Sequence, residues 1–433
     1  MKITKILPLV FAMTFALQSG AYATNGYWAP GYGAKSKSIA GACVAMTLGT
    51  MCAASNPGSL VVVGNRMDFG MSLFVPSRGF TANDDASPIG PPMGPTSIPS
   101  GEYESSNDFF LIPHFAYNQM LDDKSSLGIT IGGNGGMNTE YDSAIFRNFS
   151  NPMAPSTQAS SPTGIDLMQV LIGITYSRKI TEQHSFGITP VFAIQSFEAQ
   201  GLQPFKPFSL HPDHVTNNGH DISYGTGIRF GWLGKITDRL TLGASYQTKT
   251  WMSKFDDYKG LFAEEGNFDI PANYDLGFAF KATEKLTLAF NYQRIEYSTV
   301  NAMANASDLV FMPGQTLLGT NDGLGFGWDD IDIFKFGLQW QYNPNFTFRM
   351  GYSRSDNPFP NSQALFNTLA PAVVRTHYTV GFSTPLSERF EFNMAFLYAP
   401  NEKVHGTNIN TGPQTGFIEM TQYELIMGLG MKF

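Results

Sequence analysis

Side chains that could carry out catalysis are scattered along this chain. A lipid-processing enzyme would need a nucleophile and a base side by side near the membrane face. No serine–histidine pair shares an outward strand face. The seven histidines fall in an expected strand, a turn and loops: His114, His184, His211, His214, His220, His377 and His405. The sequence therefore predicts no enzyme activity and no cofactor.

The two cysteines, Cys43 and Cys52, lie close together near the N-terminal end. Export to an oxidising compartment would permit a disulfide that closes a short loop. Two buried thiols are the alternative interpretation. A metal site at this pair lacks nearby histidine partners, so no bound metal is expected.

The N-terminal residues have the pattern of a secretory signal peptide. Lys2 and Lys5 give a positive start, residues 6–17 are apolar, and Ala21-Tyr22-Ala23 forms a small-x-small cleavage site. We expect residues 1–23 to be removed on export.

From Arg66 to Phe433 the chain alternates about fourteen times between short amphipathic runs and polar breaks. The breaks are alternately tight and long. The tight ones are 122–124, 181–184, 237–239, 283–285, 343–345 and 385–388, and the long ones include 79–107, 138–164, 298–330 and 400–419. Tight turns at one end of the barrel and long loops at the other are typical of an outer-membrane β-barrel. The sequence predicts an all-β, 14-stranded antiparallel transmembrane barrel over residues 66–433.

The runs alternate large apolar residues with small or polar ones, as a strand between lipid and lumen requires. In the first run Met67, Phe69 and Met71 share one face, and the opposite face carries Asp68 and Ser72. The first set is expected to touch lipid. The complementary positions of later strands carry mixed charges, which indicates an occupied lumen. Residues 24–65 lie between the signal peptide and the first expected strand and belong to neither. We therefore expect them to form a small, partly helical hatch inside the barrel.

A formal net charge of −8 argues against a nucleic-acid partner, which needs a basic surface. Acidic pairs fall in the long loops, where solvated carboxylates are the expected state. Divalent-ion contacts with surface lipopolysaccharide are the alternative. The pairs are Asp84-Asp85, Asp256-Asp257 and Asp329-Asp330.

Several motifs resemble the FadL/TodX (OMPP1) family of outer-membrane transporters for long-chain fatty acids and hydrocarbons. They include Asn25-Gly26-Tyr27, residues 31–37, and Asn56-Pro57-Gly58 leading into residues 64–66 in the hatch, and residues 112–115, 132–136, 252–255 and 270–274 in the barrel. Similarity covers essentially the whole mature chain. One departure is Gly58, where the family motif has alanine. The resemblance implies a monomeric barrel, a plugging hatch, and an apolar ligand that enters from outside and leaves sideways.

By the same resemblance, an external ligand groove lies between two long loops, here residues 200–220 and 255–268. Their apolar residues are the candidates for ligand contact: Leu202, Phe205, Phe208, Leu210, Leu261 and Phe262. Packing of the loops on each other is the alternative.

A deeper site is expected beside the hatch, where a cation on the lumen wall could meet a carboxylate. Arg349, Lys335 and Lys281 are the candidates. Pairing with lumen glutamates or hatch carbonyls is the alternative fate of these three.

The run Gly132-Gly133-Asn134-Gly135-Gly136 should weaken the third strand, and Pro113 removes a ladder donor on the second. A local gap in the pairing is expected there. The resemblance makes this gap the lateral exit, and a bulge that only accommodates the hatch is the alternative.

The sequence thus predicts a passive outer-membrane transporter for hydrophobic molecules, with long-chain fatty acids favoured over alkanes or aromatics. A general diffusion porin is the competing function. Expected partners are the apolar ligand, outer-membrane lipid and lipopolysaccharide, and the protein is expected to be a monomer.

Overall fold

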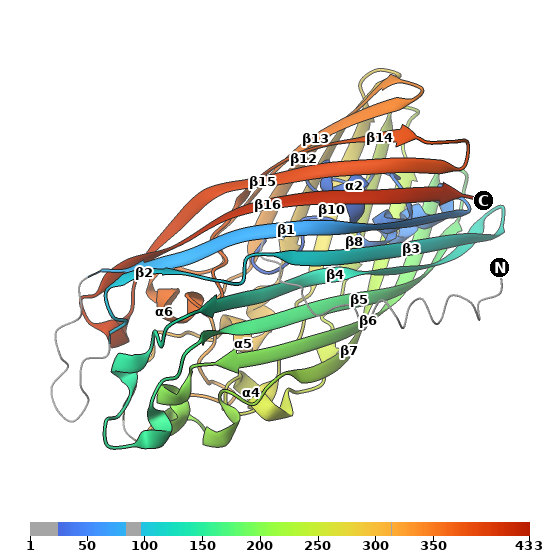
Figure 1. Ribbon diagram of the computed structural model, residues 1–433. Coiled ribbons are helices and arrows are strands. Elements are labelled where there is room, and N and C mark those ends of the chain that lie inside the picture. The colour runs from blue at the N-terminus through green and yellow to red at the C-terminus, as the bar shows by residue number, and fades with distance from the viewer. Residues whose placement is uncertain (1–24, 84–96, 313) are drawn as a thin grey trace.

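The computed structural model describes residues 25–83, 97–312 and 314–433. The predicted signal peptide, residues 1–23, and the pair Asp84-Asp85 lie outside these ranges. Within the described residues, fourteen antiparallel strands form one closed sheet (Figure 1). Those strands are β1 (Arg66–Ala82), β3 (Phe110–Asp122), β4 (Ser125–Tyr141), β5 (Thr163–Lys179), β6 (His184–Gln200), β7 (Asp221–Lys235), β8 (Leu240–Gln247), β10 (Asn273–Lys281), β11 (Leu286–Ile295), β12 (Ile331–Asn343), β13 (Phe346–Ser355), β14 (Thr376–Pro385), β15 (Phe390–Thr407) and β16 (Thr415–Lys432).

Each strand pairs with its neighbour in the chain, and β16 closes the barrel on β1 in register from Arg66↔Lys432 to Ala82↔Gly416. Two short strands extend the sheet at the loop end: β2 (Gly101–Glu104) pairs with β1, and β9 (Trp251–Met252) pairs with β7. Closure pairs every barrel strand of the described residues on both sides, as spanning a bilayer requires, and only the end of the β3–β4 ladder beyond His114↔Gly132 is left unpaired.

The predicted loop asymmetry is confirmed. All six tight breaks connect strand pairs at the end of the barrel where β16 ends, on the right in Figure 1, and the long connections lie at the opposite end. The prediction of a long loop over residues 400–419 is wrong. β15 continues to Thr407 and β16 begins at Thr415, because cross-strand contacts such as the Lys403–Glu419 ion pair of 3.1 Å extend this hairpin beyond the barrel.

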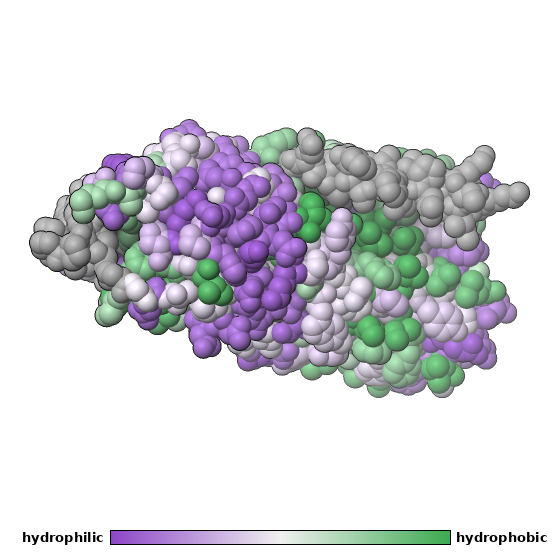
Figure 2. Space-filling model, turned by 90° about the horizontal axis from the view of Figure 1, so that it is seen from below, coloured by the Kyte–Doolittle hydropathy of each residue, from purple (hydrophilic) through white to green (hydrophobic). Residues whose placement is uncertain are grey.

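Alternation of outward and inward side chains follows the sequence pattern. Phe69, Met71 and Val75 of β1 are exposed, whereas Asp68, Ser72 and Phe74 are buried. Seen from below, hydrophobic residues gather over the half of the molecule near the tight turns, and hydrophilic residues over the loop-bearing half (Figure 2). None of the helices in the described part of the chain is long and apolar enough to cross a bilayer.

The N-terminal segment, residues 25–65, lies inside the barrel, where we call it the hatch. It contains α2 (Gly33–Lys37), the 3-10 helices Thr50–Ala54 and Pro57–Ser59, and α3 (Leu60–Val63). Asn56 ties it to the wall, because its amide donates to the carbonyl oxygens of Val44 and of Trp232 in β7 at 2.6 and 2.8 Å. Gly58 donates its N–H to Asn56 Oδ1 at 2.9 Å, so the Asn56-Pro57-Gly58 turn is capped.

Wall glycines let the hatch approach closely. A Cβ at Gly231 would lie 2.2 Å from Asn56 Oδ1, and one at Gly351 would lie 2.3 Å from the carbonyl carbon of Ile39. Both positions need glycine because the hatch occupies the space. Two ion pairs, Lys35–Glu391 and Lys37–Glu424, join α2 to β15 and β16.

The long connections fold over the mouth. They contain α4 (Ala263–Gly266), α5 (Asn301–Ala304), α6 (Ala364–Asn367) and the 3-10 helices Arg147–Phe149, Pro155–Thr157, Gln203–Phe208, Pro212–His214, Asp256–Tyr258, Tyr297–Thr299, Asn361–Gln363 and Ile409–Thr411. Their apolar side chains form, with the inner wall and the hatch tip, one continuous buried cluster. The barrel is therefore filled by the hatch in its lumen and by the folded loops at its mouth.

Candidate functional site

An aromatic cluster lies between the loops at the barrel mouth. Phe205 is its centre, with ring centroids 5.0 Å from Phe146, 5.5 Å from Phe311 and 5.2 Å from Phe366. These rings come from four different connections, so the cluster exists only when the loops fold together. Edge-to-face and tilted contacts of this kind add to the burial energy of each ring.

Four of the six predicted loop residues line a narrow cavity beneath this cluster: Leu202, Phe205, Leu261 and Phe262. Its volume is about 40 Å³, enough for a few water molecules but too small for an alkyl chain or a benzene ring. The side chains must shift to admit such a ligand. Phe208 is half-buried against Phe311 at 5.0 Å, whereas Leu210 is 48% exposed and lies outside the cavity.

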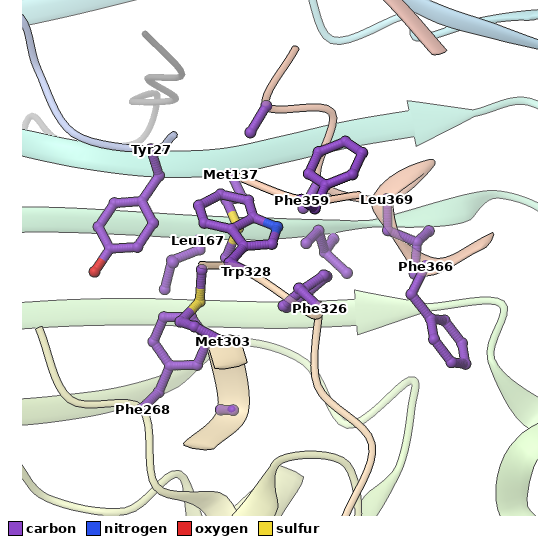
Figure 3. Packing of buried hydrophobic residues seen from close by; sticks show 14 of the residues in the cluster. Tyr27, Met137, Leu167, Phe268, Met303, Phe326, Trp328, Phe359, Phe366 and Leu369 are labelled. Carbon is purple, nitrogen blue, oxygen red and sulfur yellow. The ribbon is translucent and has the colours of Figure 1, made fainter. Parts of the chain in front are cut away.

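The same apolar cluster continues inward to the tip of the hatch (Figure 3). Phe326 contacts Trp328 at 6.3 Å between ring centroids, and Trp328 contacts Tyr27 of the hatch at 6.1 Å. Trp328 Nε1 donates to Asn367 Oδ1 at 2.6 Å, which fixes the indole. We call the series Phe311, Phe205, Phe366, Leu369, Phe326, Trp328 and Tyr27 the aromatic track.

Tyr27 lies against the glycine-rich part of β4. The β3–β4 ladder ends at His114↔Gly132, and the β4–β5 register shifts between Gly133 and Gly135. Asn134 is therefore an extra, bulged residue. Gly135 resumes the β4–β5 ladder opposite Gln169, and Pro113 pairs with Met71 of β1. The gap expected from the sequence is present.

The bulge is held from inside by the hatch. Ala29 N–H donates to the Asn134 carbonyl at 2.8 Å, and Tyr32 OH donates to Asn134 Oδ1 at 2.8 Å. A Cβ at Gly135 would lie 2.0 Å from the carbonyl oxygen of Tyr27, so only glycine permits this approach. The gap and the inner end of the aromatic track thus meet at the hatch tip.

At its outer end the gap is bridged. Ser106 N–H donates to the Glu140 carbonyl at 2.9 Å, and Glu140 N–H donates to Ser105 Oγ at 3.0 Å. Residues 105–109, which we call the crossing segment, connect β2 to β3 and contact both Arg78 of β1 and Glu140 of β4. The β3–β4 gap therefore comprises residues 110–113 of β3 and 133–139 of β4, closed above by the crossing segment.

The three predicted lumen cations do not form one site. Lys335 donates to the Pro30 carbonyl of the hatch at 3.1 Å, and Arg349 donates to Gln339 Oε1 at 2.7 Å and to Ser383 Oγ at 2.6 Å. Both are buried. Lys281 is exposed at the end of β10, beside the tight turn, so it does not reach the lumen. The alternation assigned Lys281 to the inward face, but this residue ends β10 at the rim, where the strand has already left the barrel interior.

Cys43 and Cys52 are buried free thiols in the hatch, so the predicted bridge is not formed. Ser36 Oγ lies 3.2 Å from Cys43 Sγ. At the loop rim, His220 lies between two carboxylates, 3.1 Å from Asp166 and 3.2 Å from Glu198. Hydrogen bonding to Asp166 raises the pKa of His220. Among the described residues no group of three or more His, Cys, Asp or Glu is placed to hold a metal ion.

Sequence reasoning missed Trp328, Tyr297 and Arg78 as parts of this region. Trp328 and Tyr297 fall in a long connection without periodicity, and nothing local in the sequence marks them. Tyr27 is part of the hatch motif Asn25-Gly26-Tyr27, but the sequence assigned it no role. In the structure this motif is held by Tyr297, whose OH donates to the Asn25 carbonyl at 2.6 Å.

A closed barrel with an apolar outer belt, a hatch in its lumen and an apolar interior track defines a plugged outer-membrane transport protein. The model of the family described as outer membrane protein transport protein (OMPP1/FadL/TodX) matches residues 11–424. The chain belongs to this family of outer-membrane hydrocarbon and fatty acid transporters, and its location is the outer membrane.

Solved structures have the same fold at low identity. The P. putida toluene transporter TodX has a TM-score of 0.67 at 22% identity, with 94% of this chain and 99% of that chain covered. A Pseudomonas aeruginosa FadL homologue has a TM-score of 0.64 at 15% identity, covering 94% and 98%. The Ralstonia pickettii toluene transporter TbuX has a TM-score of 0.61 at 15% identity, covering 94% and 99%. No curated protein sequence matches the chain.

Proposed function

We propose that this protein is a passive transporter that takes up a hydrophobic molecule at its external loops and releases it sideways through the β3–β4 gap. The observation that carries the proposal is the meeting of the aromatic track with that gap at Tyr27. Long-chain fatty acids are the favoured cargo. The protein acts as a monomer without enzyme activity, surrounded by outer-membrane lipid and lipopolysaccharide.

A sideways route suits an apolar cargo. Moving an alkyl chain into water costs about 0.8 kcal/mol per CH₂, hence on the order of 10 kcal/mol for a long-chain acid. A track of apolar side chains avoids that exposure, and release into the membrane avoids the aqueous space below the hatch. The filled lumen favours this function over a general diffusion porin, which needs an open water channel.

Cells in which this protein is the sole member of its family test the proposal. Expression should increase the uptake of labelled long-chain fatty acid severalfold, while the purified protein conducts few ions in planar bilayers. Large, steady conductance with no gain in fatty acid uptake would establish the porin alternative instead.

The external groove gives a further prediction. Phe205→Ala should weaken loop-side binding of fatty acid by about thirtyfold, because a buried aromatic ring contributes on the order of 2 kcal/mol. Leu210→Ala is the matched control, since Leu210 is exposed outside the cavity. Binding is measured by titrating the purified protein with a fluorescent fatty acid. Equal affinities for both variants would refute this placement of the groove.

A further inference from the structure

A buried cation lies at the β3–β4 gap, and no carboxylate in the described part of the chain pairs with it. Arg78 of β1 is 2% exposed. No carboxylate among the described residues lies within ion-pair distance of its guanidinium. The side chain hydrogen bonds to the Asn107 carbonyl through Nη2, whereas Nε has no partner. An unpaired buried charge is unfavourable unless something neutralises it.

The surrounding strands show why Arg78 faces the gap. β1 pairs with β3 up to Phe74↔Phe110 and with β2 from Gly79↔Glu104, so Arg78 lies between the two pairings. The crossing segment begins here, directly after β2, and Ser105 N–H donates to the Arg78 carbonyl at 2.9 Å. The guanidinium carbon lies 5.5 Å from the ring centroid of Phe110, the first residue of β3.

Apolar side chains lie on both sides of this cation. Phe74, Phe110 and Ile112 form a small buried cluster beside the gap. On the other side Phe80 of β1 contacts Tyr141 at 5.1 Å within the main apolar cluster. Two carboxylates act on Arg78 electrostatically without forming an ion pair with it. Asp166 is already engaged by His220 at 3.1 Å and by the Asn138 amide at 2.8 Å, and Asp108 of the crossing segment is exposed.

We propose that Arg78 binds the carboxylate of an amphiphilic cargo at the β3–β4 gap and thereby selects such cargo over neutral molecules of the same length. This inference rests on the proposed function. A guanidinium donates in a planar fork that matches a carboxylate, and its contacts with charged groups are the stronger class of hydrogen bond. The alkyl chain would lie on the apolar side chains next to it. Pairing of Nη2 with the cargo would also release the Asn107 carbonyl and so loosen the crossing segment.

A matched pair of cargoes separates this role from a packing role. Uptake of palmitate and of cetyl alcohol is measured in cells whose sole family member is the wild type, Arg78→Met, or Lys281→Met. We expect Arg78→Met to lower palmitate uptake about tenfold while cetyl alcohol uptake stays within about twofold. Lys281→Met removes an exposed cation at the opposite rim and should change neither.

Equal loss of both cargoes in Arg78→Met, or no loss of either, would overturn the inference. If Arg78→Met does not assemble, Arg78→Lys keeps the charge without the planar fork. It should lower the palmitate-to-alcohol ratio by a smaller factor, and an unchanged ratio would overturn the inference equally. Absence of uptake of both cargoes by the wild type would instead contradict the proposed function itself.

Discussion

A Lys37→Met variant is expected to raise the equilibrium constant for opening of the hatch by about two to four orders of magnitude. The side chains of Lys37 and Glu424 are 5% and 1% exposed, and they form the ion pair between α2 and β16. Glu424 Oε2 has no other partner. Removing one member of a buried ion pair leaves an uncompensated charge, which destabilises by about 3–5 kcal/mol. The closed barrel ladder does not depend on this pair, so the loss falls on the hatch.

The measurements are hydrogen exchange of residues 25–65 and conductance in planar bilayers. Both should increase in Lys37→Met. A Lys37→Met/Glu424→Met double variant should recover much of the closed state, because two packed apolar side chains replace a buried pair at little or no net cost. Lys235→Met is the exposed control: its partner Asp238 is 96% exposed, so hatch exchange and conductance should match those of the wild type. Unchanged hatch exchange in Lys37→Met would show that other contacts hold the hatch.

Deleting Asn134 is expected to reduce uptake of hydrophobic cargo by about tenfold or more. Without the extra residue, Gly133↔Val170 and Gly135↔Gln169 become consecutive pairs, and β4 can run in one register along β5. A straight β4 can then pair with β3 beyond His114↔Gly132, which closes the gap. The deletion also removes the carbonyl that accepts from Ala29.

Uptake in cells and heat-dependent gel mobility of the purified barrel are measured together, so that loss of folding is distinguished from closure. Asn134→Ala is the matched control. It keeps the backbone bulge but removes the bond from Tyr32, and its uptake should stay within about threefold of the wild type. Full uptake by a folded deletion variant would contradict sideways release at this gap.

Much of the barrel could be predicted from the sequence because its determinants are local. Side chains of a strand alternate in direction whatever the fold around it, so Phe69 and Asp68 could be assigned to opposite faces. Tight turns such as 283–285 are also set by a few neighbouring residues. The Gly132–Gly136 run signalled a weak strand, and the gap lies where it was predicted. The extension of the β15–β16 hairpin was instead predicted as a loop. A strand that lies outside the lipid carries polar residues on both faces, so its sequence has no alternation that distinguishes it from a loop.

The candidate site was only partly predictable. Leu202, Phe205, Leu261 and Phe262 were named as apolar loop residues, but the cavity that they share depends on loops more than fifty residues apart. The partners of Lys335 and Arg349 also depend on where the hatch and the neighbouring strands lie. A residue type identifies a possible interaction, and only the fold selects the partner.

The sequence by itself determined the class of the protein, the order of its strands and the outward face of each. Tertiary structure decided that the hatch lies against Gly231 and Gly351, that Tyr27 reaches the bulge, and that Arg78 forms no ion pair with a carboxylate of the described residues. The reason is physical. A period of two residues is a property of the extended backbone, whereas contacts between the hatch, the loops and the wall depend on barrel closure, which brings distant segments together.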